Sequence, residues 1–149
     1  MLLRDACTPE VVCCGPQTRV TEAAHLMRQR HVGDLVVVDD PDGDRVPLGV
    51  VTDRDIVVEV LGNDLDPART KLTDIMRTPV VIAAETEDMT QVVERMRTHG
   101  VRRIPVVGDG GKLVGMVTLD DLLKQFAADT TALIDVIAKG QTHERRMRR

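Results

Sequence analysis

Residues Gly49–Asp55 have the sequence Gly-Val-Val-Thr-Asp-Arg-Asp, and residues Gly115–Asp121 have the sequence Gly-Met-Val-Thr-Leu-Asp-Asp. Both stretches carry Gly-x-x-Thr-x-x-Asp after a β-branched run. Further towards the N-terminus, residues Asp5–Val38 align without a gap on Asp74–Val107, at a constant offset of 69 residues. So regular an offset indicates that one structural unit occurs twice in the chain. Clefts at internal interfaces of this kind are common sites for small ligands.

Each repeat carries the pattern of an amphipathic helix. Val20, Ala23, Ala24 and Met27 recur at helical spacing, and the apolar residues of Met89–Met96 recur at the same spacing in the second repeat. A second helix is expected beyond Thr52 in the first repeat and beyond Thr118 in the second. The expected strands are 11–13, 35–38 and 48–51 in the first repeat, and 80–82, 104–107 and 113–117 in the second.

The last two strands of each repeat are joined by turn-forming residues, Asp39–Asp44 and Gly108–Gly111, so each pair is expected to form a β-hairpin. The order within a repeat is then strand, helix, strand, strand, helix. A unit of about 60 residues buries a small fraction of its surface, so the two repeats should pack on each other. We therefore predict an α+β fold with pseudo-twofold symmetry and a three-stranded sheet in each half.

The chain is divided by its composition into three segments. Residues 62–67 are rich in helix-stopping and turn-forming residues, which places the boundary between repeats 1–64 and 65–128. Residues 129–149 form the third segment. There Leu133, Val136 and Ile137 have helical spacing, which predicts a terminal helix that covers the core or a partner subunit, followed by a basic tail.

Composition excludes several classes of function. The net charge of −4, the pI near 5.5 and the presence of one Phe with no Trp or Tyr all argue against nucleic-acid binding. No apolar run approaches the length of a membrane span, and the N-terminus lacks a signal-peptide pattern, so we expect a cytoplasmic protein. Cys7, Cys13 and Cys14 have no disulfide or zinc-site spacing. They are interpreted as reduced thiols, of which one of the adjacent pair could be exposed and reactive.

The sequence also shows no arrangement of residues that is typical of a catalytic or metal-binding site. The four histidines are scattered, the chain contains no serine, and no Cys-His pairing is indicated. The acidic segment Asp40–Val51 begins like a calcium loop, but Arg45 stands where the loop requires glycine. We therefore expect neither an enzyme nor a metal site.

The duplicated motif has two interpretations. Thr52-x-x-Asp55 and Thr118-x-x-Asp121 both match a helix-capping box, which would explain them without any ligand. Alternatively, the strand glycines Gly49 and Gly115 could mark the close approach of a planar base. The threonine would then lie beside a phosphate at the helix N-terminus, and the aspartate would accept hydrogen bonds from ribose hydroxyls.

With these motifs, the chain resembles the CBS-domain family, specifically a stand-alone tandem pair or Bateman module. The resemblance covers residues 3–126 and rests on the duplicated motif and on the strand Arg103–Val107, which contains Pro105. It implies a dimer of two modules and a regulatory domain that binds AMP, ADP, ATP or S-adenosylmethionine. It also implies ribose contacts for Asp55 and Asp121, ribose or phosphate contacts for Thr52 and Thr118, and base contacts at Val11-Val12 and Val80-Val81.

The two repeats differ at charged positions near the motif. Arg54 corresponds to Asp120, Arg103 corresponds to Asp34, and Arg102 corresponds to Gly33. We therefore expect two unequal clefts. The cleft nearest Arg54, Arg102 or Arg103 should bind the phosphate-bearing ligand, and a cleft lined by Asp34 or Asp120 should repel it. These arginines could instead form surface ion pairs of small energetic value.

The sequence thus predicts a non-catalytic sensor of adenosine derivatives that acts as a homodimer through a separate, unknown effector protein. No cofactor is required beyond the adenosine-containing ligand. The expected ligand-binding residues are Val12, Thr52, Arg54, Asp55, Val81, Arg102, Arg103, Pro105, Thr118 and Asp121. The alternative is a structural or protein-interaction module that binds no ligand, in which both motifs only cap helices.

Overall fold

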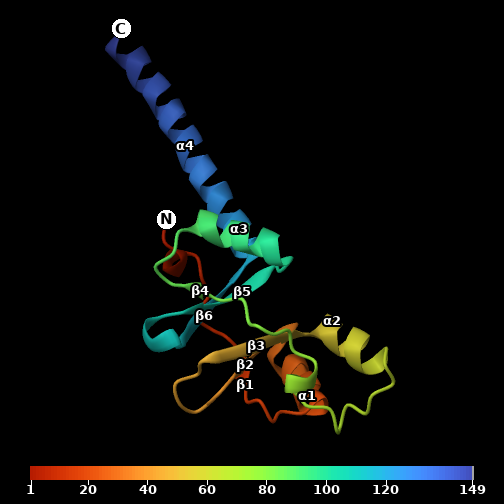
Figure 1. Ribbon diagram of the computed structural model, residues 1–149. Helices are drawn as coiled ribbons and strands as arrows, with labels where there is room; N and C mark the ends of the chain where they lie inside the picture. The colour runs from red at the N-terminus through yellow and green to blue at the C-terminus, as the bar shows by residue number, and fades with distance from the viewer. Residues whose placement is uncertain (149) are drawn as a thin grey trace.

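The computed structural model describes residues 1–148 and contains two three-stranded sheets with the same order of elements (Figure 1). In the first repeat the elements are β1 (Cys13–Cys14), α1 (Val20–Arg30), β2 (Asp34–Val38), β3 (Pro47–Thr52) and α2 (Asp53–Asp55), which continues as the π-helical segment η2 (Ile56–Leu61). In the second repeat they are β4 (Ala83–Ala84), α3 (Met89–His99), β5 (Arg103–Val107), β6 (Leu113–Thr118) and α4 (Leu119–Met147). Short 3₁₀ turns are η1 (Leu3–Asp5), η3 (Leu72–Asp74) and η4 (Asp109–Gly111).

Each sheet has a parallel edge and an antiparallel hairpin. In the first repeat, β1 pairs with β2 in parallel and β2 pairs with β3 in antiparallel orientation. The second repeat has the same pairing for β4, β5 and β6. Both predicted hairpins and both predicted amphipathic helices are therefore confirmed. The first strand of each repeat starts later than predicted, because only Cys13-Cys14 and Ala83-Ala84 pair with the central strand.

The segments that precede the two sheets are exchanged between the repeats. Leu3 is fully buried in the core formed by α3, β5 and β6, whereas Leu72 is fully buried in the core of the first repeat. Backbone hydrogen bonds match this exchange, since Leu3 N donates to Glu87 O at 2.9 Å and Leu72 N donates to Thr18 O at 2.9 Å. The order of the chain places Leu3 in one repeat, but its packing places it in the other.

A third apolar cluster joins the two halves. Val36 and Val38 of β2 pack there with Leu113 and Met116 of β6, and all four side chains are buried. The two repeats therefore share one interface core and form one globule, as their small size predicts.

Helix α4 leaves this globule instead of covering it. Leu122 is buried in the second core, but the helix continues through Gly140 and projects away from both sheets (Figure 1). Every side chain from Thr130 to Arg148 is exposed. Of the two roles expected for the terminal helix, covering the core of its own chain is therefore wrong, because only the first turns of this 29-residue helix contact the globule. Within residues 1–148, the helices are all too short or too polar to cross a membrane.

Candidate functional site

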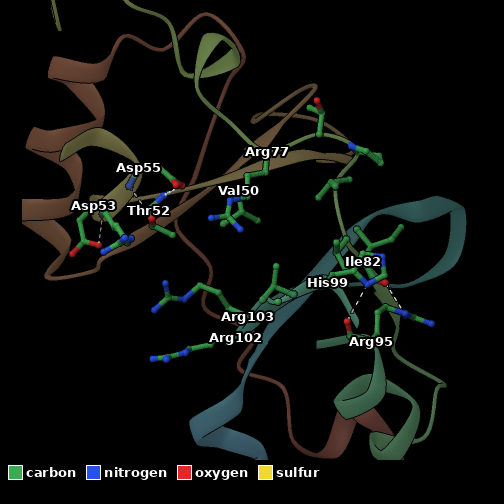
Figure 2. Close-up of a pocket in the computed structure, with 17 residues that line it drawn as sticks. Val50, Thr52, Asp53, Asp55, Arg77, Ile82, Arg95, His99, Arg102 and Arg103 are labelled. Carbon is green, nitrogen blue, oxygen red and sulfur yellow. Dashed lines mark hydrogen bonds between the residues drawn. The ribbon is translucent and has the colours of Figure 1, made fainter. Parts of the chain in front are cut away.

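A pocket of about 960 Å³ opens between the two repeats. One wall comes from the end of β3 and the start of α2, and the other comes from the segment before β4, the end of α3 and the start of β5. Figure 2 shows Thr52, Asp53 and Asp55 on one side of the space, with Arg102 and Arg103 on the other. The lining residues are Val50, 52–55, 77–82, Arg95 and 99–103.

The Thr-x-x-Asp motif forms a complete capping box in both repeats. Thr52 N donates to Asp55 Oδ2 at 2.9 Å, and Asp55 N donates to Thr52 Oγ1 at 3.1 Å. The matching distances in the second repeat are 3.0 Å and 3.1 Å, between Thr118 and Asp121. The interpretation of the motif as a helix cap, which needs no ligand, is therefore confirmed for both repeats. Within residues 1–148 the cap uses one carboxylate oxygen of Asp55, which leaves Oδ1 for a further hydrogen bond.

The strand glycines have a structural role that differs from the predicted one. A Cβ on Gly49 would lie 2.6 Å from Met76 Sδ, and a Cβ on Gly115 would lie 2.9 Å from Thr8 O. Real Cβ atoms do not approach other atoms so closely, so both glycines make room for segments of the same chain. The expectation that they mark the approach of a planar base is wrong, because the approaching groups are the exchanged segments.

Cationic side chains dominate the charge of the pocket. The lining includes Arg54, Arg77, Arg95, Arg102 and Arg103, against the carboxylates of Asp53 and Asp55. Arg95 has a structural role, since it donates to Ile82 O at 2.7 Å and pairs with Glu87 at 2.8 Å. Within the described part of the chain, the guanidinium groups of three other arginines have no ion pair and no hydrogen-bond acceptor: Arg54, Arg77 and Arg102.

Arg103 contacts its own counterpart in the other repeat. Its Nε lies 3.7 Å from Asp34 Oδ1, which is too long for a hydrogen bond. This nitrogen is buried and has no hydrogen-bond partner among residues 1–148. Burial raises the pKa of the Asp34 carboxyl, while Arg103 opposes that rise. Arg103 and Asp34, which were expected to make the two clefts unequal in charge, therefore lie beside each other at the interface between the repeats.

Six of the ten expected ligand-binding residues line this pocket: Thr52, Arg54, Asp55, Val81, Arg102 and Arg103. The other four lie elsewhere. Val12 packs against the first core, Pro105 is buried in β5 opposite Met116, and Thr118 and Asp121 form the second capping box.

Sequence reasoning missed three residues of the lining, Arg77, Arg95 and His99. Arg77 precedes the segment that was expected to border a base, so its position near the pocket could have been inferred. Arg95 and His99 lie one turn apart on α3, and His99 Nδ1 lies 3.0 Å from Arg95 O. Their spacing of four residues places them on the same face of α3. Nothing in the sequence showed that this face lines the pocket.

Cys14 is buried, and Cys7 and Cys13 are partly buried. Burial raises the pKa of Cys14 to about 11, and it also raises the pKa values of Cys7 and Cys13 above the ordinary range. All three are free. Since the thiolate is the nucleophile, none of them is activated for reaction at neutral pH, and the suggestion of a reactive thiol finds no support.

A sequence model of the CBS domain matches residues 3–62 and 72–128. The chain belongs to the CBS-domain family. It is 32% identical to Hypoxic response protein 1 of Mycobacterium tuberculosis over 123 residues, which are 83% of each chain. An uncharacterized protein of Methanopyrus kandleri is 35% identical over 77% of this chain, and the match spans 57% of that relative's length.

Solved structures of CBS proteins share the fold. Hypoxic Response Protein I, solved with two coordinated zinc ions, superimposes with a TM-score of 0.75 and 31% identity over 84% of this chain and 98% of that one. In residues 1–148 of the present chain, no three His, Cys, Asp or Glu side chains gather as a metal site. The CBS domain protein PAE2072 of Pyrobaculum aerophilum, solved in complex with AMP, gives a TM-score of 0.72 and 25% identity over 82% of this chain and 90% of that one.

Proposed function

We propose that this CBS pair is a regulatory module that binds an adenosine nucleotide in the pocket between its repeats and signals through a separate effector protein. The observation that carries the proposal is a set of three arginines, Arg54, Arg77 and Arg102, whose guanidinium groups are unpaired within residues 1–148 and surround a pocket that also contains the Asp55 carboxylate. AMP in the structure of the Pyrobaculum relative supports the choice of adenosine.

Each part of the pocket suits one part of such a ligand. The apolar side chains of Val50, Val80, Ile82 and Val101 offer a surface for the base. Asp55 Oδ1 is a suitable acceptor for a ribose hydroxyl, because Oδ2 already holds the helix cap. The three guanidinium groups would bind phosphate oxygens through charge-assisted hydrogen bonds.

The charge of the pocket also indicates which adenosine derivative it prefers. Five arginines face two aspartates there, so each added phosphate finds further positive charge. S-adenosylmethionine carries a positive sulfonium and an ammonium group, which this lining should repel. We therefore expect ATP and ADP to bind more tightly than AMP, and AMP more tightly than adenosine.

Titration calorimetry with ATP, ADP, AMP, adenosine and S-adenosylmethionine tests this order directly. Thermal unfolding gives an independent measurement, since a ligand at 100 times its Kd adds about 2.7 kcal/mol to the free energy of unfolding. Equal affinities for adenosine and ATP would contradict the phosphate role of the arginines. No binding and no thermal shift with any of the five compounds would favour the ligand-free interaction module, in which both Thr-x-x-Asp motifs only cap helices.

A further inference from the structure

The C-terminal part of α4, residues 127–148, is termed the arm. It starts where the helix leaves the second core, and it extends away from both sheets in Figure 1. Its large apolar side chains face solvent, with Leu133 68%, Val136 68% and Ile137 62% exposed. A stripe of exposed aliphatic side chains on a long helix indicates an interaction surface.

Apolar residues occupy six of nine positions that are separated by alternating steps of four and three along α4. This is the spacing of the a and d positions of a coiled coil. Asp135 lies on the opposite side of the helix, because two residues turn the chain by about 200° from Leu133. The positions on this seam are Leu119, Leu123, Phe126, Thr130, Leu133, Ile137, Gly140, Glu144 and Met147.

The charges of the arm are separated along its length. The half formed by residues 127–137 contains Asp129 and Asp135 and no basic residue. The half formed by residues 138–148 contains Lys139, Arg145, Arg146 and Arg148 against Glu144 alone. A parallel pair of arms would place the basic half of one arm beside the basic half of the other, whereas an antiparallel pair places the two basic halves at opposite ends.

From these observations we infer that the arm pairs antiparallel with the arm of a second copy of this chain. A register centred on Asp135 places Leu133 of one molecule opposite Ile137 of the other. The same register places Thr130 opposite Gly140 and Leu123 opposite Met147, so apolar pairs meet at the centre and at both ends of the overlap. Gly140 is mid-helical, and a Cβ added to it would meet no atom of residues 1–148 within 4 Å, so this position leaves space for the opposing helix.

The length of α4 fits this arrangement. A helix of 29 residues is about 43 Å long. In the proposed register the overlap runs from Leu123 to Met147 of both chains, so it includes residues 123–126 of α4, and the end of each arm lies beside Leu123 of the other chain. The paired surface is separate from the nucleotide pocket, and the inference does not depend on what that pocket binds.

The first test is the mass of the full chain in sedimentation equilibrium. The double variant Leu133→Asp/Ile137→Asp places two carboxylates on the seam, and we expect it to halve the assembly mass of the wild type. The matched control is Ala128→Asp/Thr142→Asp, which adds the same charge on the outer side of the helix and should leave the mass unchanged. An unchanged mass in the seam variant, or an equal loss in the control, would overturn the proposal.

The second test establishes the orientation. Chains carrying Leu123→Cys are mixed with chains carrying Met147→Cys under mild oxidation, with wild-type protein as the control for the native cysteines. Antiparallel arms should give a disulfide-linked dimer in the mixture and none in either variant alone. Linked dimers in each variant alone would indicate parallel arms, and the absence of any link in the mixture would equally overturn the antiparallel register.

Discussion

The residues that line the pocket and the residues at equivalent positions of the other repeat share the hairpin and the capping box but carry opposite charge. The lining of the pocket contains five arginines and two aspartates. At the equivalent positions, found by the offsets of 69 and 66 residues, stand one arginine and four acids: Glu10, Arg30, Asp34, Asp120 and Asp121. The repeat thus preserves the hairpin and the capping box in both halves, while the charges around them are reversed.

This difference separates what the fold requires from what a ligand would require. Both halves keep Thr and Asp at the helix start because both helices need a cap. Only the first of these caps lies in a lining with five arginines. The motif alone therefore indicates only a capped helix N-terminus, and the residues around it indicate whether a ligand binds.

The largest effect expected from a single change concerns a feature that the two halves share. Leu3 and Leu72 occupy equivalent positions, and each is fully buried in the core of the opposite repeat. Leu3→Ala and Leu72→Ala should each lower the free energy of unfolding by about 2–5 kcal/mol, because each leaves a cavity. Urea unfolding measures both. A loss below about 1 kcal/mol for either one would show that its half does not depend on the exchanged segment.

Replacing three arginines of the lining by the residues at the equivalent positions should remove the net positive charge of the pocket. In the triple variant Arg54→Asp/Arg77→Thr/Arg102→Gly, the pocket receives the residues that stand at the equivalent positions. Hydrogen bonds to charged groups contribute about 1.5–3 kcal/mol each, less when exposed, so calorimetry should show ATP affinity reduced by about 100-fold to 1,000-fold. Arg28→Asp/Arg30→Asp, on the exposed side of α1, lowers the net charge by the same four units and is the control. Retained ATP affinity in the triple variant would contradict the assignment of phosphate to these arginines.

Removing the two aspartates of the capping boxes sharpens the comparison further. Asp55→Ala and Asp121→Ala should each cost about 1 kcal/mol of stability, since each helix loses the same cap. Nucleotide affinity should fall only for Asp55→Ala, because only Asp55 lines the pocket. Calorimetry with AMP and ATP on both variants makes the test, and equal losses of affinity would contradict the asymmetry.

The smallest effect is a pH dependence at the interface of the two halves. Burial raises the pKa of Asp34, so the folded chain holds this proton more tightly than the unfolded chain. Its contribution to stability is therefore greatest at low pH and declines as the pH rises from about 4 through the folded pKa. Asp34→Asn removes this decline, so the stability of the variant relative to wild type should increase between about pH 4 and pH 7. A constant difference across that range would contradict the raised pKa.

Much of the fold was predictable because the repeat states each pattern twice. The helices at Val20 and Met89 and the hairpins after them follow from spacing and turn composition, and each prediction in one half supports the other. The exchange of residues 1–8 and 66–76 was not predictable, since spacing along the chain does not show against which repeat a short apolar segment packs. The same gap explains the error over Gly49 and Gly115, whose close neighbours are these segments.

Part of the pocket lining was predictable from the positions at which the two repeats differ in charge. Arg54, Arg102 and Arg103 were found because their counterparts are Asp120, Gly33 and Asp34. Arg95 and His99 could not be placed, because their position depends on how α3 is rotated against the other half. The contact of Arg103 with Asp34 could not be predicted either, because the two residues occupy equivalent positions in the two repeats.

The exchange of segments has a consequence for how such a chain could have arisen. An ancestor with a single repeat would have had no core for its own first residues, and a neighbouring molecule would have had to supply one. Two such molecules that exchanged their first segments would already have had the present architecture. Fusion of two such copies would need only a tether at residues 62–67, and it would leave the two halves free to diverge in charge while their shared framework stayed the same.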